Sequence, residues 1–245
     1  MDIENIFNKI NFIIKPEDNY RNAYFFRFKK GLCKLIGLDR KFTFSNCILD
    51  KDVENINLKN ALLKIDSMST YAIGHLVNQI CQRLTENQIY LNIGCWKGFT
   101  LISGMLGTSC KVIGVDNFSQ CDGPKNIFYS NFEKYKNKKK HFFYDQDYKV
   151  FYKNFKKKNE KVSFYYYYGE HSYKNQYENL EIADNFLDKN SIVLIDDINF
   201  QEVEKGTKDF LNKTKSNYKV LKEIKTANNH CHPSFWNGIM ILKKL

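Results

Sequence analysis

Proline, arginine and long apolar runs are all scarce in this chain. Only three prolines occur in 245 residues, and no internal repeat or low-complexity linker interrupts the sequence. No apolar run approaches the roughly 18 residues that a helix needs to span a bilayer, which excludes a membrane span by hydropathy. Asp2 and Glu4 interrupt the N-terminus, so we expect no secretory signal there.

Cysteine occurs without the spacings that mark a disulfide framework or a metal knuckle. The seven cysteines form no Cys-x-x-Cys pair, and their odd number argues against complete pairing. Scattered thiols of this kind indicate a reducing compartment, so we expect a cytoplasmic protein. The positions are 33, 47, 81, 95, 110, 121 and 231.

The net charge of +11 comes almost entirely from lysine. Only four of the 38 basic residues are arginine, the residue that proteins favour for base edges and bidentate phosphate contacts. The charge therefore indicates a solvated lysine surface more than a nucleic-acid footprint. A basic rim that favours a phosphate-bearing small molecule, such as a nucleotide-linked sugar, remains open.

The composition, with 43% hydrophobic and 16% aromatic residues, is that of a folded globular protein. A chain of this length can bury one sizeable core with a small appendage. Residues 1–66 show short helical patterns, such as Ile3, Ile6 and Ile10 on one face, and carry no catalytic spacing. We therefore expect an N-terminal helical cap over 1–66 and a main domain over 67–245.

From residue 89 onward, apolar strand-like segments alternate with helical patterns. This alternation predicts an α/β fold with a parallel sheet and helices on both faces. The last two strand candidates are joined only by a loop, so we expect them to pair antiparallel. A helix is expected over Gln176–Leu187, and Ser69 is the expected N-cap of a helix that runs to Ile80. The strand candidates are Ile89–Ile93, Lys111–Asp116, His141–Tyr144, Val162–Tyr168, Ser191–Asp196, Tyr218–Ile224 and Gly238–Leu242.

The stretch Tyr90–Thr100 joins an apolar strand to two glycines four residues apart, with a helix-like segment after them. A second apolar strand follows and ends in Asp116. The glycines let backbone approach a ligand, and an acid at that place accepts hydrogen bonds from ribose hydroxyls. The Gly-x-Gly-x-x-Gly spacing of dinucleotide sites is absent, so the unit favours S-adenosylmethionine over NAD.

Four segments carry a family resemblance. Val162–Tyr173 ends in Tyr-Gly-Glu-His-Ser-Tyr, Ser191–Asp197 ends in paired acids, Val112–Phe118 ends in Val-Asp-Asn-Phe, and Trp236–Ile239 reads Trp-Asn-Gly-Ile. Together they resemble the class I methyltransferase family that includes the macrocin and mycinamicin sugar O-methyltransferases. The resemblance covers about 67–245 and implies a Rossmann-like, seven-stranded, mostly parallel sheet with an antiparallel last strand. It also implies S-adenosylmethionine as cofactor and a homo-oligomer, by default a dimer.

His171 is the expected general base. It lies just past the fourth strand, where open parallel sheets place their ligand crevice, and its ordinary pKa suits proton abstraction near neutrality. The resemblance implies the same role, and the alternative is a structural histidine at the strand end. Asp196 and Asp197 end the fifth strand at the same face. They could orient His171, hold substrate hydroxyls or bind a divalent ion, or they could form a helix N-cap with a solvated acid.

The resemblance implies a Mg²⁺ site formed by the first acid of an Asp-Gly-Asp-His segment and by the paired acids. This chain has Tyr168 at the first position, and a neutral phenol is a poor ligand for a hard cation. Glu170 is a weak substitute. The sequence therefore disfavours Mg²⁺ without excluding it, with Asp196 and Asp197 as the ligands if an ion binds.

The cofactor contacts are expected from the glycine turn and from the ends of the second and third strands. Asn92 stands where relatives often carry an acid. Asp147 matches the acid that meets adenine, with Asp145 as the competing choice, and an exposed turn acid is the other interpretation of Asp147. The cofactor-binding candidates are Asn92, Gly94, Cys95, Gly98, Asp116, Asn117 and Asp147.

The expected substrate contacts are Tyr168, His230 and His232. The His-Cys-His run at 230–232 lacks the partner ligands of a zinc site, but its loop should open onto the active face. Trp236 is either a pocket wall or ordinary core.

The sequence thus predicts an S-adenosylmethionine-dependent O-methyltransferase. Its expected substrate is a sugar hydroxyl, in a nucleotide-linked sugar for surface polysaccharide or in a glycosylated metabolite. An RNA methyltransferase is favoured only by charge, because Tyr-Gly-Glu-His stands where amine-methylating relatives often carry Asn/Asp-Pro-Pro-aromatic. A non-catalytic module that kept the fold is the third interpretation, supported by Tyr168 and Asn92.

Overall fold

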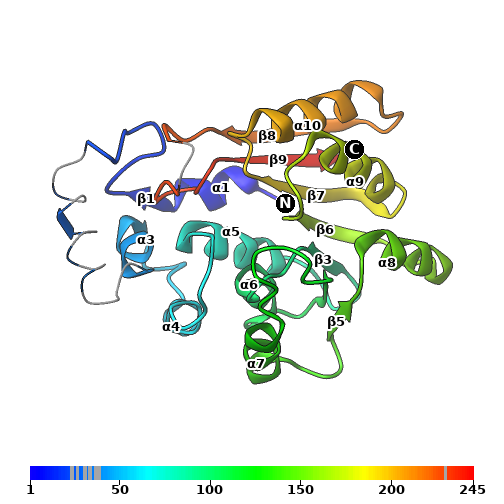
Figure 1. Ribbon diagram of the computed structural model, residues 1–245, viewed down its shortest axis with the longest axis horizontal. Coiled ribbons are helices and arrows are strands. Elements are labelled where there is room, and N and C mark those ends of the chain that lie inside the picture. The colour runs from blue at the N-terminus through cyan, green and yellow to red at the C-terminus, as the bar shows by residue number, and fades with distance from the viewer. Residues whose placement is uncertain (23–24, 26–27, 30–31, 33–34, 36–39, 229–230) are drawn as a thin grey trace.

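The computed structural model describes residues 1–22, 25, 28–29, 32, 35, 40–228 and 231–245. Its centre is a seven-stranded sheet in the order β5-β4-β3-β6-β7-β9-β8 (Figure 1). The strands are β3 (Ile89–Ile93), β4 (Lys111–Asp116), β5 (His141–Asp145), β6 (Val162–Tyr167), β7 (Leu187–Asp196), β8 (Tyr218–Ile224) and β9 (Ile239–Lys244).

The strand directions confirm the predicted fold class. The five strands from β3 to β7 pair in parallel, whereas β9 is antiparallel to both β7 and β8. Several predicted strand boundaries differ by one or two residues, and the largest error is at β7, which begins at Leu187, a residue that the helical pattern had assigned to a helix. Leu187 instead pairs with Val162 across the sheet. The sheet pairing therefore outweighs the local helical periodicity there.

Helices cover both faces of the sheet, so strand residues are buried on both sides (Figure 1). On one face, Tyr90 stacks on Phe164 with ring centroids 4.7 Å apart, in a hydrophobic cluster with the helices α5 (Tyr71–Cys81), α6 (Phe99–Met105) and α7 (Lys125–Tyr135). On the other face, Leu91 and Tyr165 belong to a cluster with the helices α8 (Tyr148–Phe155), α9 (Tyr173–Asp184) and α10 (Gln201–Lys213).

The N-terminal region adds helices α1 (Ile3–Asn8), α3 (Arg40–Asn46) and α4 (Ile56–Leu62) and an antiparallel pair, β1 (Ile10–Phe12) with β2 (Cys47–Leu49). Ile10 therefore starts a strand, which corrects its expected place on a helix. The buried side chains of α1 join the same cluster as α5, and the Phe44 ring stacks on Tyr71 at 4.8 Å. The division at residue 66 stays a prediction.

The helix α5 begins one residue later than the sequence suggested. Thr70 is its N-cap, since the Thr70 hydroxyl accepts a hydrogen bond from the Ile73 amide and donates one to the Ser234 carbonyl at 2.6 Å. Ser69, the expected cap, is buried beside it. Across the described ranges, no helix has the length and apolarity to span a membrane.

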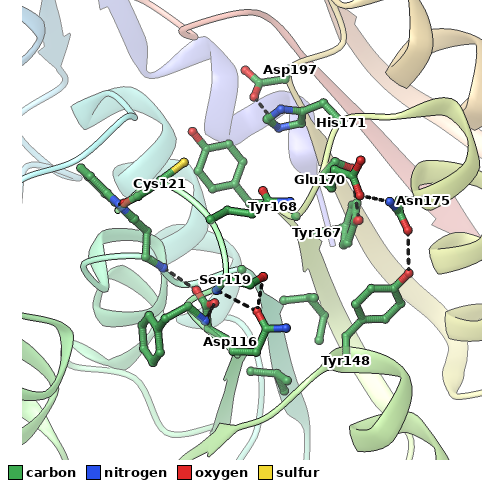
Figure 2. A pocket seen from close by; sticks show the side chains of 18 of the residues that line it. Asp116, Ser119, Cys121, Tyr148, Tyr167, Tyr168, Glu170, His171, Asn175 and Asp197 are labelled. Atoms are coloured by element: carbon green, nitrogen blue, oxygen red, sulfur yellow. Dashed lines mark hydrogen bonds and ion pairs between the residues drawn. The ribbon is translucent and has the colours of Figure 1, made fainter. Parts of the chain in front are cut away.

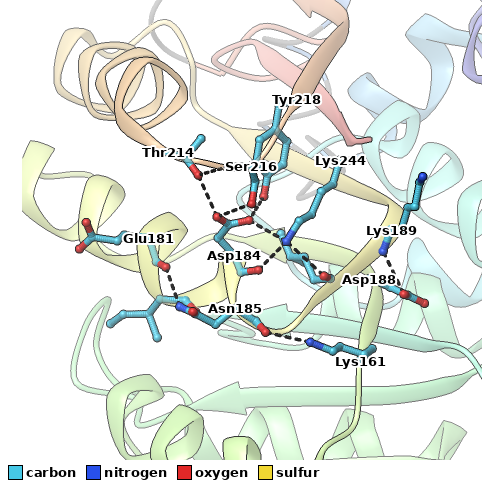
Figure 3. Close-up of polar contacts among 12 residues, drawn as sticks. Lys161, Glu181, Asp184, Asn185, Asp188, Lys189, Thr214, Ser216, Tyr218 and Lys244 are labelled. Atoms are coloured by element: carbon cyan, nitrogen blue, oxygen red, sulfur yellow. Dashed lines mark hydrogen bonds and ion pairs between the residues drawn. The ribbon is translucent and has the colours of Figure 1, made fainter.

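Asp184, at the end of α9, fastens the last hairpin to the helices (Figure 3). Its carboxylate accepts hydrogen bonds from the hydroxyls of Thr214, Ser216 and Tyr218, at 2.9, 2.9 and 2.7 Å, and forms a 2.8 Å ion pair with Lys244. These partners come from the end of α10, from β8 and from β9. One half-buried carboxylate thus joins the elements at the edge of the sheet away from β5.

Candidate active site

A cavity of about 440 Å³ opens at the carboxyl ends of the parallel strands. It lies where β4 and β6 flank β3 on opposite sides, so that the strand order reverses across it, the place where open α/β sheets bind ligands. Its size is that of a small-molecule site. The strand-end residues that line it include Ile93, Gly94, Val115, Asp116, Gln146, Asp147, Tyr167, Tyr168 and Asp197, with Trp236 and Asn237 from the loop before β9.

Gly94 turns the chain sharply at the end of β3. Its φ is +80°, and a Cβ there would lie 1.9 Å from the backbone oxygen of Tyr168. Glycine is therefore required by the close approach of β6 as well as by the turn. Gly98, with φ +97°, is the N-cap of α6 and does not line the cavity.

The carboxylate of Asp116 holds the glycine turn in place (Figure 2). One oxygen, Oδ2, accepts hydrogen bonds from the amides of Cys95 and Trp96, both at 2.8 Å, and Oδ1 accepts one from the Phe118 amide at 2.7 Å. An ionised carboxylate offers about four acceptor positions, so these three bonds leave room for one more donor. Asp116 therefore has a structural role and keeps an acceptor for a ligand hydroxyl.

Two of the predicted cofactor residues are buried behind the turn. Asn92 is fully buried, donates to the Gly94 carbonyl at 2.9 Å and accepts from the Thr100 hydroxyl at 2.7 Å. Cys95 is also buried. Neither belongs to the cavity lining. Asn92 shares its face of β3 with Tyr90, whose hydroxyl lies 3.2 Å from the Asn92 Oδ1, so its side chain shapes the turn from the core side.

Asn117 and Asp147, like Gly94 and Asp116, do line the cavity. Asn117 lies beside Asp116, and its side-chain oxygen accepts a hydrogen bond from the Ser119 hydroxyl at 2.8 Å. Asp147 lines the wall while it caps α8 through the Lys149 amide. Asp145, the competing choice for adenine, is outside the lining and pairs with Lys125 at 2.5 Å. Of the two acids, Asp147 is the one that lines the cavity, and its contact with adenine stays a prediction.

His171 and Asp197 lie next to each other, on the side of the cavity away from the glycine turn (Figure 2). The His171 Nε2 lies 2.9 Å from the Asp197 Oδ2, in an ion pair without the alignment of a full hydrogen bond. Asp197 is 2% exposed, and its Oδ1 accepts a 2.8 Å hydrogen bond from Asn237. Its φ of +58° is in the left-handed region, which costs a non-glycine residue roughly 1 kcal/mol. Strained backbone of this kind is common at functional sites.

The surrounding acids tune the imidazole. Burial lowers the pKa of His171, but the carboxylates of Asp197 and Asp196 outweigh it and the net pKa lies above the ordinary 6.5. Asp196 itself points into the core, where its carboxylate accepts hydrogen bonds from the Tyr166 hydroxyl and from the Asp197 amide. Burial, followed by the charge of Asp197, raises the pKa of Asp196. Asp197 is therefore the member of the pair that contacts His171, whereas Asp196 accepts a hydrogen bond from the Asp197 amide on the core side.

The donor set does not fit a divalent ion. The Asp196 and Asp197 carboxylates are already engaged by the contacts just described, and the Tyr168 hydroxyl donates a 3.0 Å hydrogen bond to the Met68 carbonyl. No cluster of three or more His, Cys, Asp or Glu side chains that could hold an ion occurs within the described part of the chain. A hard cation needs several oxygen ligands, so the possible Mg²⁺ site at Asp196 and Asp197 gains no support.

His232, one of the two histidines predicted to contact substrate, does not line the cavity. His232 is fully buried: its Nε2 donates to the Asp18 carbonyl at 2.9 Å and its Nδ1 accepts from Ser234. Burial lowers the pKa of His232. It therefore anchors the N-terminal segment. His230 lies outside the described residues. Tyr168, the third prediction, does line the cavity, with its ring centroid 5.9 Å from that of His171.

Several lining residues escaped sequence reasoning. Tyr148 donates a 3.2 Å hydrogen bond to Asn175, which in turn donates one to Glu170 (Figure 2). These three hydrogen-bonded side chains form one wall of the cavity. Phe200 packs 5.5 Å from the His171 ring, and Asn237 orients Asp197. Only Asn237 carried a signal, since it stands in the Trp-Asn-Gly-Ile segment. The others follow strand ends or start helices, and their side-chain direction depends on tertiary packing.

The sequence matches no protein-family model and no curated protein. Solved structures do resemble the fold. The O-methyltransferase from Bacillus cereus, in complex with S-adenosylhomocysteine, is 12% identical with a TM-score of 0.58, over 78% of this chain and 92% of that one. A putative O-methyltransferase from Klebsiella pneumoniae is 12% identical with a TM-score of 0.56, over 78% and 90%.

The O-methyltransferase TomG from Streptomyces achromogenes, which is involved in tomaymycin synthesis and was solved with S-adenosylmethionine, is 9% identical with a TM-score of 0.56, over 78% of this chain and 90% of that one. At such identities the likeness concerns the fold alone. Together with the strand order, it shows that this chain has the Rossmann-like methyltransferase fold that its sequence predicted.

Proposed function

We propose that the protein is an S-adenosylmethionine-dependent O-methyltransferase that acts on a sugar hydroxyl. One observation carries the proposal: a single cavity has the Asp116-clamped glycine turn on one side and the His171–Asp197 pair on the other. The first side suits a nucleoside and the second suits an acidic proton. The three solved relatives, described as O-methyltransferases, support the same reaction class.

The cofactor would lie along the strand ends. Gly94 leaves its backbone uncovered there, Asp116 keeps one acceptor for a ribose hydroxyl, and Asp147 lies where adenine would reach. When bound, S-adenosylmethionine supplies the electrophilic methyl group. The aromatic rings of Tyr168 and Phe200 flank His171, with their centroids 5.9 and 5.5 Å from that of the imidazole.

His171 is the proposed base. It takes the proton of the hydroxyl as that oxygen bonds to the methyl carbon, and the buried Asp197 carboxylate stabilises the imidazolium that forms. Asn237 fixes the direction of Asp197. This His–Asp pair needs no metal ion, in keeping with a donor set that does not fit one.

A sugar hydroxyl is proposed as acceptor because the lining beyond His171 is polar. Glu170, Asn175 and Tyr148 supply hydrogen-bonding groups of the kind that hold sugar hydroxyls. The lining lysine, Lys149, is paired with Glu178 at 2.9 Å, so the described cavity offers little to a phosphate. A nucleotide-linked sugar, a dimer and a cytoplasmic location therefore rest on the sequence alone.

The proposal is tested by incubating the protein with S-adenosylmethionine and a panel of nucleotide sugars and glycosides, with mass spectrometry for a gain of one methyl group. We expect one acceptor class to be methylated, with release of S-adenosylhomocysteine. The His171→Ala variant should lose activity by about 100-fold or more while it binds S-adenosylhomocysteine normally.

Full activity of His171→Ala would remove the base role. A wild-type protein that binds no cofactor would instead favour the non-catalytic interpretation.

A further inference from the structure

The cavity beside His171 differs in charge from the chain as a whole. The sequence has 38 basic and 27 acidic residues. Among the described residues that line the cavity, by contrast, four are acids and one is a lysine, Lys149, whose ammonium group pairs with Glu178 at 2.9 Å. The four acids are Asp116, Asp147, Glu170 and Asp197. The cavity therefore presents negative charge within a basic protein, which favours a positively charged ligand.

Three of these acids are engaged by the protein itself. Asp116 accepts hydrogen bonds from three backbone amides of the glycine turn and its neighbour loop. Asp147 caps α8 through the Lys149 amide. Asp197 contacts His171 and accepts a hydrogen bond from Asn237. Each of these carboxylates thus has a positioning task in the fold or beside the proposed base.

Glu170 is the acid without such a task. Its exposed carboxylate accepts a hydrogen bond from the neutral side-chain amide of Asn175. The cationic residues closest to it along the chain, His171 and Lys174, pair with other acids, and so does Lys149 in the cavity lining. A carboxylate forms its strongest hydrogen bonds with charged donors. Glu170 can therefore accept an ammonium group from a ligand.

The position of Glu170 sets where that ammonium group would lie. Glu170 immediately precedes His171, so their Cα atoms are about 3.8 Å apart. Figure 2 shows the Glu170 carboxylate between His171 and Asn175. A sugar whose hydroxyl reaches His171 thus places another substituent of the same ring beside Glu170.

A positive charge at this place also suits the chemistry of the base. Burial lowers the pKa of His171, but contact with Asp197 and the charges of Asp196 and Glu170 raise it above 6.5. The imidazole must be neutral to accept a proton, and an ammonium group beside Glu170 offsets part of the surrounding negative charge. The bound amine therefore favours the form of His171 that takes the proton of the hydroxyl.

We propose that Glu170 selects an amino sugar as the acceptor, by pairing with a protonated amine on the ring that carries the methylated hydroxyl. This inference rests on the proposed function, because it names the acceptor class of the same cavity. A neutral sugar can hydrogen-bond to Glu170 and Asn175 but forms no ion pair there. A sugar acid is repelled by the carboxylates of the lining.

The test is a binding titration that needs no methyl transfer. Trp96 and Trp236 are the two tryptophans of the sequence, and both line the cavity, so intrinsic fluorescence reports its occupancy. The full chain is titrated with methyl glucosaminide, methyl N-acetylglucosaminide and methyl glucoside, and with the galacto forms of all three, with and without S-adenosylhomocysteine. We expect at least one amine to bind about fivefold more tightly than its N-acetyl and hydroxyl counterparts, with a preference that salt weakens.

The Glu170→Gln variant keeps an acceptor oxygen for Asn175 and removes the charge. It should bind the amine only as well as the neutral glycosides. The charge reversal Glu170→Lys should bind the amine still more weakly and should prefer methyl glucuronide. The matched control, Glu181→Gln, removes an exposed acid of α9 that lies outside the cavity lining, and it should keep the preference for the amine.

Equal affinity for the amines and the neutral glycosides, no binding of either amine, or a preference that survives in Glu170→Gln would overturn the proposal. The proposed reaction has a separate outcome. Methyl transfer to a neutral sugar combined with any of these results would remove the amino sugar and leave the reaction. Absence of cofactor binding combined with an intact preference for the amine would remove the reaction and leave the amine site.

Discussion

At the scale of single residues, the account depends on how Asp197 acts on His171. The carboxylates around the imidazole raise its pKa above 6.5 in spite of burial, and only the neutral imidazole can accept a proton. Activity should therefore increase with pH through the His171 pKa, with a midpoint above 6.5. The measurement is kcat/KM against pH, which reports groups of the free enzyme.

The Asp197→Asn variant should lower both the rate and this midpoint. Without the nearby negative charge, burial dominates and the imidazole loses its proton at lower pH. The matched control is Asp188→Asn, which removes an exposed acid at the opposite end of β7 and should leave the profile unchanged. A profile that is identical in Asp197→Asn and the wild type would show that Asp197 does not act on the base.

Residue-level predictions from the sequence were best where chemistry alone singles out a side chain. The expected placement of His171, Asp116 and Asp147 in one cavity agrees with the structure. His232 was assigned to the wrong environment, because its partner Asp18 is 214 residues away in the sequence and no local pattern could reveal it. The inward direction of Asn92 follows from its position two residues after Tyr90, on the same face of a strand.

At the scale of elements, the glycine turn after β3 is the most constrained feature. A Gly94→Ala side chain would strain a φ of +80° and also lie 1.9 Å from the Tyr168 backbone. The matched control, Gly107→Ala, has a similar φ of +67° but meets nothing nearer than 3.4 Å. Chemical denaturation should show that Gly94→Ala loses about 2 kcal/mol more in the free energy of unfolding. Equal losses would mean that β6 relaxes away from the turn.

The Asp184 contacts give a second prediction at this scale. Burial tends to raise the pKa of Asp184, but Lys244 and the three hydroxyl groups lower it below 3.8. The group therefore stabilises the fold above about pH 4, and that stability is lost as the pH falls through its folded-state pKa. Asp184→Ala should reduce the free energy of unfolding at pH 7 by about 3 kcal/mol.

The control for this variant is Glu181→Ala, an exposed acid on the same helix, with an expected change within about 0.5 kcal/mol. The Asp184→Ala variant should also show a smaller loss of stability between pH 4 and the acid transition than the wild type. Denaturation curves for the two variants that coincide at pH 7 would show that the hairpin does not depend on Asp184.

At the scale of the whole molecule, the number and direction of the strands in the central sheet were predicted from the sequence. Buried parallel strands are apolar at nearly every position, so β3, β4, β6 and β7 stand out from their surroundings. Boundaries were less accessible: Leu187 fits a helical stripe, and only its pairing with Val162 makes it a strand residue. The N-terminal antiparallel pair was missed because each of its strands has only three residues.

The central claim is that the cavity beside Gly94 and Asp116 holds S-adenosylmethionine without help from a metal ion. The most direct measurement is calorimetric titration of the full chain with S-adenosylhomocysteine, once with magnesium and once with a chelator. The account predicts one binding site with the same micromolar affinity, about 8 kcal/mol, in both conditions. Absence of binding in both would contradict the cofactor site, and binding only with magnesium would contradict the metal-independent His171–Asp197 pair.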